Sequence, residues 1–214
     1  MLKKYSKTLI ITTVIILLPM LAGMILWNKL PEQFPIHFNA AGEVDGYAGK
    51  AFGVFGTPLI LAAIQWLCAV GSLKMDPKAE NLEGKVFSLV LWVTPVLSIV
   101  MHALVYCTAL GMSMNVQIIM PLLIGLLMVI IGNWLPKCKP TWTLGIKLPW
   151  TLADENNWNR THRFAGPVWV VCGMVIMLCA LIGGAFLWVM LAAFVVMIVV
   201  PTVYSFLLFK GKIK

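Results

Sequence analysis

Six long apolar runs constrain the fold of this chain more than any other feature of its sequence. Each run holds about 20 residues, the length that an α-helix needs to cross a hydrocarbon core of about 30 Å. The runs are Thr8–Trp27, Phe52–Leu73, Val86–Leu110, Gln117–Leu135, Phe164–Gly183 and Phe186–Phe209. Only 11% of the residues are charged, against roughly 25% in soluble domains. We therefore predict an all-α, polytopic integral membrane protein with six transmembrane helices.

Two of these runs need a further argument. Residues 164–209 form one apolar stretch that is too long for a single span, and Gly183 and Gly184 are the best candidates for the turn that divides it. The first run follows lysines, as a signal peptide would. Its apolar core of about 19 residues exceeds the roughly 7 to 15 of a signal sequence, so we expect it to remain as a span.

The placement of the 16 Lys and Arg residues predicts the orientation of the chain. All but two lie before the first span, between spans two and three, between spans four and five, or after span six: Lys3, Lys4, Lys7, Lys74, Lys78, Lys85, Lys137, Lys139, Lys147, Arg160, Arg163, Lys210, Lys212 and Lys214. Only Lys29 and Lys50 remain for the other side. Since cytoplasmic loops are enriched in Lys and Arg, both termini are predicted to be cytoplasmic. The net charge of +8 then reflects membrane orientation and calls for no direct nucleic-acid binding.

The two longest polar segments suggest a division of the chain. We expect residues 1–73 to hold the first two helices with an outward Pro/Gly-rich loop at 28–51. Residues 74–214 then hold four further helices with a cytoplasmic loop at 136–163. The cysteines offer no outward pair for a disulfide, because they lie in spans or in that cytoplasmic loop: Cys68, Cys107, Cys138, Cys172 and Cys179.

The outward segment Leu30–Lys50 combines residues that break regular structure with residues that make directed polar contacts. Its candidate functional residues are Pro31, Pro35, His37, Phe38, Asn39, Gly42, Asp45 and Gly46. Glycine permits a positive φ and aspartate can bond nearby backbone amides, so we expect Asx and glycine turns to fold the loop. His37 with Glu43 and Asp45 has the elements of a metal site, but the loop lacks a second histidine, and we predict no metal and no cofactor. Hydrolase, metalloprotease and phosphate-loop motifs are also missing from the sequence, so no enzyme is predicted.

The cytoplasmic segment Thr141–Gly166 is the second informative polar stretch. Thr151 followed by Asp154 matches a capping box, which predicts a short helix from Thr151 to Arg163. We expect its tryptophans to lie at headgroup level and its cationic side chains to reach lipid phosphate or a protein acid. These are Trp142, Trp150, Trp158, Arg160, His162 and Arg163. An interfacial anchor for the fifth span and a partner-binding surface both remain open.

Polar groups within the spans are functional candidates because hydrocarbon leaves them without partners. His102 is either a proton relay or substrate contact, or a neutral histidine bonded to a neighbouring helix through Gln65, Tyr106 or a carbonyl. The middle of every predicted span lacks Asp, Glu, Lys and Arg, which favours the second interpretation. Five spans each contain a proline, and we read these residues as packing features: Pro19, Pro58, Pro95, Pro121 and Pro201.

Both polar segments resemble one known family. The outward loop, LPEQFPIHFNAAGEVDGYAGK, looks like the membrane domain of unknown function found in SdpI-type proteins. The inner stretch, GIKLPWTL followed by W and HRFAG in residues 145–166, resembles the second signature of the same family. The inner residues that carry this resemblance are Gly145, Lys147, Pro149, Trp150, Thr151, Trp158, Arg160, His162 and Gly166.

The resemblance implies a multi-pass protein of the bacterial plasma membrane that gives immunity to a secreted sporulation-delaying-type toxin peptide. In the best-known member, the toxin-engaged protein also sequesters an ArsR-type repressor at the membrane, so the implied partners are the toxin peptide, membrane lipids and a cytosolic repressor. The immunity role is the first expectation and the signalling role the second. The alternative is a small-solute transporter or channel, for which His102 and the five prolines would be pathway elements. A third possibility is a structural membrane scaffold.

Overall fold

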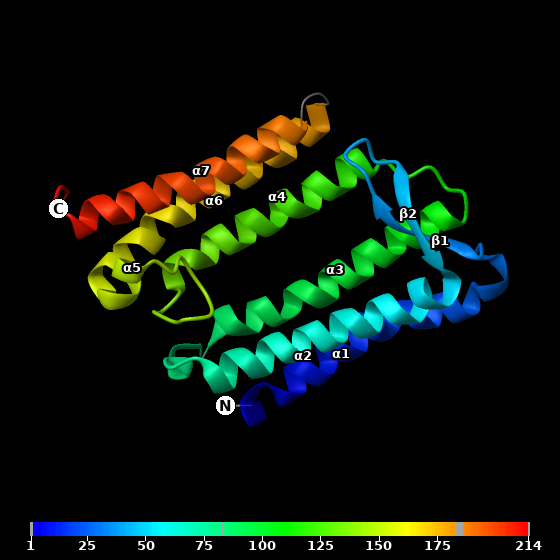
Figure 1. Ribbon diagram of the computed structural model, residues 1–214, viewed down its shortest axis with the longest axis horizontal. Coiled ribbons are helices and arrows are strands. Elements are labelled where there is room, and N and C mark those ends of the chain that lie inside the picture. The colour runs from blue at the N-terminus through cyan, green and yellow to red at the C-terminus, as the bar shows by residue number, and fades with distance from the viewer. Residues whose placement is uncertain (1, 83, 183–185, 214) are drawn as a thin grey trace. The chain divides into compact units, whose positions relative to one another are not determined.

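The computed structural model describes residues 2–82, 84–182 and 186–213 (Figure 1). Within these ranges, six helices are long and apolar enough to cross a membrane: Leu2–Ile25, Phe52–Met75, Lys85–Ala109, Val116–Lys137, Glu155–Ile182 and Leu187–Phe209. The prediction of an all-α membrane protein with six spans is confirmed. The turn predicted at Gly183 and Gly184 lies outside the described residues.

The elements follow one another in a simple order. The helices are α1 (Leu2–Ile25), α2 (Thr57–Met75), α3 (Lys85–Ala109), α4 (Val116–Trp134), α5 (Pro149–Ala153), α6 (Glu155–Ile182) and α7 (Phe186–Phe209). The strands β1 (Gln33–Phe38) and β2 (Val44–Gly49) lie between α1 and α2. Short 3₁₀ turns cover Trp27–Lys29, Ala79–Leu82 and Leu135–Lys137, and a π-helical turn covers Phe52–Gly56.

The elements form two compact units. One contains residues 1–75 and 87–116, and therefore α1, the two strands, α2 and most of α3. The other contains residues 76–86 and 117–214, and therefore α4 to α7 with the inner signature. The division at residue 73 that the polar segments suggested stays a prediction.

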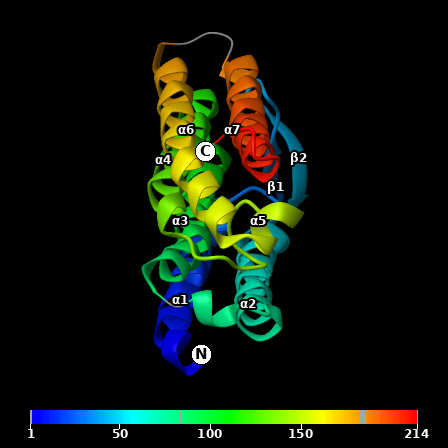
Figure 2. The same ribbon diagram turned by 90° about the vertical axis from the view of Figure 1, so that its left-hand side faces the viewer.

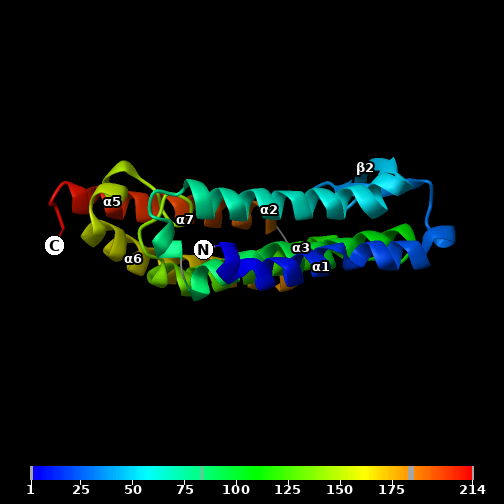
Figure 3. The ribbon, with the colours of Figure 1, turned by 90° about the horizontal axis from the view of Figure 1, so that it is seen from below.

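In the first unit, α1 lies alongside both α2 and α3 (Figure 3). The Ser98 hydroxyl of α3 donates to the carbonyl of Ile16 at 3.0 Å, and the Tyr106 hydroxyl donates to the carbonyl of Pro19 at 2.8 Å. Gly23 allows this close approach, because a Cβ there would lie 2.7 Å from the Tyr106 hydroxyl of α3. It would also lie 2.5 Å from a methyl group of Val54 in the turn before α2. Interhelical hydrogen bonds and small residues replace the hydrophobic driving force that lipid cannot supply.

In the second unit, α6 packs against α7 (Figure 2) and also against α4. Two pairs of glycines bring the backbones of α4 and α6 together. A Cβ on Gly125 would lie 2.6 Å from the carbonyl oxygen of Gly173, and one on Gly132 would lie 2.8 Å from that of Gly166. Each pair is separated from the next by seven residues on its helix, so both lie on one face.

Candidate functional site

The segment Leu30–Lys50, predicted to face outward, forms a β-hairpin at the end of the first unit that lies opposite the N-terminus (Figure 1). The Asn39 side-chain oxygen accepts the N–H groups of Ala41 at 2.9 Å and Glu43 at 3.0 Å, and Gly42 has a φ of +76°. The predicted Asx and glycine turn is therefore confirmed. The strands themselves were not predicted, because the prolines and glycines indicated irregular backbone.

Two details of the hairpin differ from the prediction. Gly46 does not have a positive φ; it is required because it lies opposite His37, whose Cβ would be 2.8 Å from an added Cβ. Asp45 bonds the Nδ1 atom of His37 at 2.5 Å instead of a backbone amide. The two strands bring these side chains together across the pair, and both remain exposed to solvent.

Lys50 fastens the base of the hairpin. Its ammonium group donates to the carbonyls of Leu30 at 3.2 Å and Trp27 at 3.3 Å, and it lies 2.7 Å from a carboxylate oxygen of Glu32. The residue is only 8% exposed. Sequence reasoning counted Lys50 as an outer charge and missed this role. The available signal was a lysine at the first turn of an apolar helix with an acid at the other end of the same loop.

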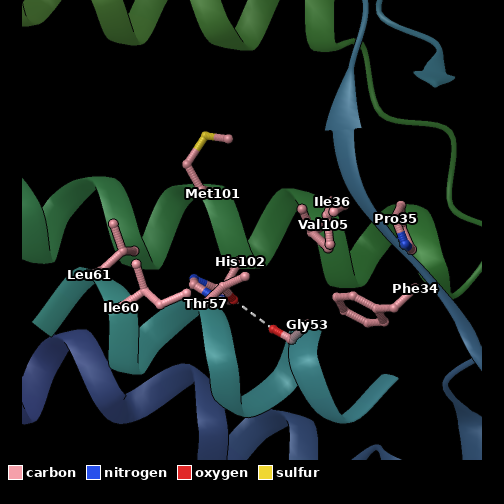
Figure 4. A pocket seen from close by; sticks show the side chains of 10 residues that line it. All are labelled: Phe34, Pro35, Ile36, Gly53, Thr57, Ile60, Leu61, Met101, His102 and Val105. Atoms are coloured by element: carbon pink, nitrogen blue, oxygen red, sulfur yellow. Dashed lines mark hydrogen bonds between the residues drawn. The ribbon is translucent and has the colours of Figure 1, made fainter. Parts of the chain in front are cut away.

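A cavity of about 310 Å³ lies between the hairpin and the helices beside it (Figure 4). Its apolar walls come from residues 34–36 of β1, from Ile60 of α2, and from Met101 and Val105 of α3. Thr57 and His102 are the polar side chains among its lining residues. The cavity therefore joins the outward signature, through Pro35, to the histidine in the third span.

His102 has three hydrogen-bonding contacts, the longest of which joins its Nδ1 to the Ser98 hydroxyl at 3.4 Å. Its Nδ1 lies 2.7 Å from the carbonyl oxygen of Ser98, and its Nε2 lies 2.9 Å from the hydroxyl of Thr57. The predicted bond to a neighbouring helix is present but comes from the Thr57 hydroxyl, because the carbonyl that His102 contacts belongs to its own helix α3. The two predicted side-chain partners are wrong, because Gln65 donates to Thr12 and Tyr106 donates to a carbonyl of α1.

The inner signature contains two helices, α5 and α6, separated at Asp154, where the sequence predicted one helix starting at Thr151. Thr151 lies inside α5, where its hydroxyl accepts the N–H of Leu148 at 2.9 Å and donates to the carbonyl of Ile146 at 2.8 Å. Asp154 is extended, and its carboxylate accepts the N–H of Asn156 at 2.9 Å. The helix predicted from residue 151 to 163 is therefore wrong. Asp154, rather than Thr151, caps the helix that starts at Glu155 and continues into the fifth span.

Trp158 and His162 are fully buried, so the expectation that they reach headgroups or phosphates is wrong. Their rings stack with centroids 4.1 Å apart. The Trp158 indole donates to the carbonyl of Cys138 at 2.8 Å, and His162 Nε2 accepts the N–H of Ile146 at 2.9 Å. Gly145 has a φ of +104° and leaves no room for a side chain against these rings. These residues hold the inner loop onto α6.

Of the other candidate residues in the inner signature, some make packing contacts between helices and others are accessible to solvent. Trp150 donates to the Ser205 hydroxyl of α7 at 2.7 Å and stacks on Phe209, so it ties α5 to the C-terminal helix. Gly166 packs on α4 as described above. Lys147 and Pro149 are exposed and Arg160 is half-buried, which leaves them accessible to a partner.

Asp76 is a residue that sequence reasoning missed. One carboxylate oxygen accepts the N–H of Lys78, and the other accepts the N–H of Trp142 and both the N–H and the hydroxyl of Thr143, all at 2.8 to 2.9 Å. Burial acts to raise the pKa of Asp76, but these hydrogen bonds together lower it below its ordinary value. The segment after α2 is thereby fixed to the start of the inner loop.

Comparison with known proteins covers both signatures. The model of the SdpI/YfhL protein family matches residues 137–205, and that of a domain of unknown function, DUF1648, matches residues 14–62. A relative from Bacillus subtilis (strain 168), Immunity protein SdpI, is 26% identical over 205 residues, which cover 95% of this chain and 97% of the relative. Residues 137–205 thus match the SdpI/YfhL family, and nearly the whole chain is similar to the Bacillus subtilis relative. With its six apolar helices, the chain is a multi-pass protein of the cell membrane. No solved structure matches it significantly.

Proposed function

We propose that the chain is a membrane immunity protein that protects its cell against a secreted sporulation-delaying-type toxin peptide. The observation that carries this proposal is the likeness to Immunity protein SdpI, which extends over nearly the whole length of both chains. A likeness confined to one signature would support only a shared module. The proposed role is protection by binding, with no chemical step.

We further propose that the hairpin faces outward and meets the toxin, with both termini and the inner signature in the cytoplasm. The distribution of Lys and Arg supports this orientation. The hairpin and the N-terminus lie at opposite ends of the first unit, as the orientation requires (Figure 1). The proposed toxin-facing residues are those predicted from the sequence, of which His37 and Asp45 are the exposed polar pair and Pro35 lines the cavity.

Expression in a toxin-sensitive bacterium tests the immunity role. Cells that carry the chain should survive added peptide that kills cells carrying an empty vector. Two variants of β2 test the hairpin: Gly46→Val places a side chain against His37, whereas Gly49→Val meets nothing within 4 Å. We expect Gly46→Val to lose protection at normal membrane abundance and Gly49→Val to keep it. Equal killing of vector and wild-type cells would refute the immunity role.

The finer proposal is that the inner signature recruits an ArsR-type repressor when toxin is bound. Trp158 and His162 are buried, so the proposed contact surface consists of Lys147, Pro149 and Arg160. Lys147→Ala combined with Arg160→Ala should abolish toxin-dependent recruitment of the repressor to membranes and keep toxin resistance. Joint loss of recruitment and resistance would instead identify these residues as part of the anchor for the fold.

A further inference from the structure

The cavity beside the hairpin contains a polar cluster that begins at the π-helical turn Phe52–Gly56. In this turn the N–H of Thr57 bonds the carbonyl of Phe52, five residues earlier. The same spacing would assign the N–H of residue 58 to the carbonyl of Gly53, but residue 58 is a proline and has no N–H. The Thr57 hydroxyl takes this place and donates to the Gly53 carbonyl at 2.7 Å (Figure 4).

The Thr57 hydroxyl also lies within hydrogen-bonding distance of His102 Nε2, at 2.9 Å. A carbonyl can only accept, and the Ser98 hydroxyl, 3.4 Å from Nδ1, already donates to the carbonyl of Ile16, so both contacts place the ring hydrogen on Nδ1. The Nε2 atom then needs a hydrogen from Thr57, which has only one and gives it to Gly53. Either Nε2 or the Gly53 carbonyl is left without a donor. The cluster is therefore one hydrogen short.

His162, the buried histidine of the second unit, has a hydrogen-bond partner of the right kind at each ring nitrogen. Nδ1 of His162 faces the carbonyl of Trp158, and its Nε2 accepts the backbone N–H of Ile146. Both ring nitrogens of that neutral imidazole are satisfied. The deficit at His102 is therefore a property of its site and does not follow from burying a histidine in this chain.

A second proton on His102 would supply the missing hydrogen at a high cost. The residue is 5% exposed, and none of the described residues that line the cavity is acidic. Its titratable neighbour is Tyr106, whose ring centroid lies 6.0 Å away and whose hydroxyl already donates to α1. A buried cation with no counter-ion is unfavourable. A donor on a bound molecule completes the cluster without that cost.

We propose that this cavity binds the indole ring of a tryptophan in the secreted peptide, an inference that rests on the proposed immunity function. The volume of about 310 Å³ is at the lower end of the roughly 300 to 1,000 Å³ typical of ligand sites, which suits one large side chain. The walls are apolar, as an aromatic ring requires. Indole carries an N–H donor and no acceptor, so it supplies what the cluster lacks and adds no new demand. A tyrosine hydroxyl would bring a further acceptor into the cavity.

Indole and N-methylindole, which lacks the donor, test this chemistry on the purified full chain in detergent. Indole should raise the thermal unfolding temperature in proportion to its occupancy, and its affinity should exceed that of N-methylindole by about tenfold, since the methylated ring leaves an acceptor unsatisfied. Ile60→Trp fills the cavity and should remove the response to indole. Leu67→Trp, at a 74% exposed position of α2, should retain it. Equal affinity for the two probes, or a full response in Ile60→Trp, overturns the proposal.

Survival assays separate this inference from the immunity function. Wild type and Leu67→Trp should protect cells, and Ile60→Trp at equal membrane abundance should not. If wild type fails to protect, the immunity function is refuted, and selective indole binding still decides the chemistry of the cavity. If Ile60→Trp protects as well as wild type, the cavity has no part in immunity. The tryptophans of the peptide can then be replaced by phenylalanine one at a time. At one position only, the replacement should reduce the protection that the wild-type chain gives its cells. If protection is unchanged at every position, tryptophan is not the occupant of the cavity.

Discussion

Substitution of Asp76 by alanine should detach the inner loop from the segment that follows α2. The carboxylate accepts four hydrogen bonds, three of them from residues 142 and 143. A hydrogen bond to a charged group contributes about 1.5 to 3 kcal/mol, and water can replace those donors that become exposed. If half of the four are lost in full at the lower figure, the free energy of unfolding falls by about 3 kcal/mol. Glu80→Ala, an exposed acid in the same segment, is the matched control.

Unfolding by sodium dodecyl sulfate in mixed micelles measures this loss, and limited proteolysis reports whether residues 141–148 become accessible. The pH dependence gives an independent check. Because the pKa of Asp76 is lowered in the folded state, its stabilising contribution is complete above the ordinary value of about 4 and disappears as the pH falls through the lower folded value. Asp76→Asn should remove this acid-sensitive part. Unchanged stability and protease resistance in Asp76→Ala would refute the assigned role.

Three further predictions follow from other parts of the structure. Gly132→Val should prevent α4 from approaching α6 and abolish stable insertion, measured as membrane abundance, whereas Gly71→Val, which meets nothing within 4 Å, should not. Lys50→Met should expose the hairpin to external protease, because it removes the donor to two carbonyls and the partner of an acid; resistance equal to wild type would contradict this. Single cysteines at Glu43 and Asn156 in a cysteine-free chain should differ on whole cells, with an impermeant maleimide labelling only the former; the reverse pattern would invert the topology.

The sequence predicted the parts of the fold that depend on composition and local chemistry. Apolar length located all six spans, and the asparagine and glycine at the hairpin tip predicted its turn. The helix cap was misplaced because Thr151 and Asp154 are both good caps, and only the tertiary contact of Thr151 with the carbonyl of Ile146 decides between them. Trp158 was expected at the interface because tryptophan is common there, but the inner loop folds over it.

The residues missed by the sequence prediction share a physical property. Lys50 and Asp76 are charged side chains that bond backbone groups brought from another segment, and no local pattern indicates such a contact. The glycines of α4 and α6 also could not be singled out from local sequence, because their role depends on contact with the other helix.

The two signatures achieve rigidity by the same means at different places in the chain. Each contains a loop with at least one glycine, and a buried charged residue helps to fix each loop. Lys50 closes the hairpin by binding carbonyls at its start, and Asp76 holds the inner loop by accepting amides at its beginning. Ordering a loop before a partner arrives removes part of the entropy cost of binding. If the two loops bind the proposed partners, they do so as preformed surfaces, and variants of Lys50 and Asp76 should weaken that binding without changing any residue that touches the partner.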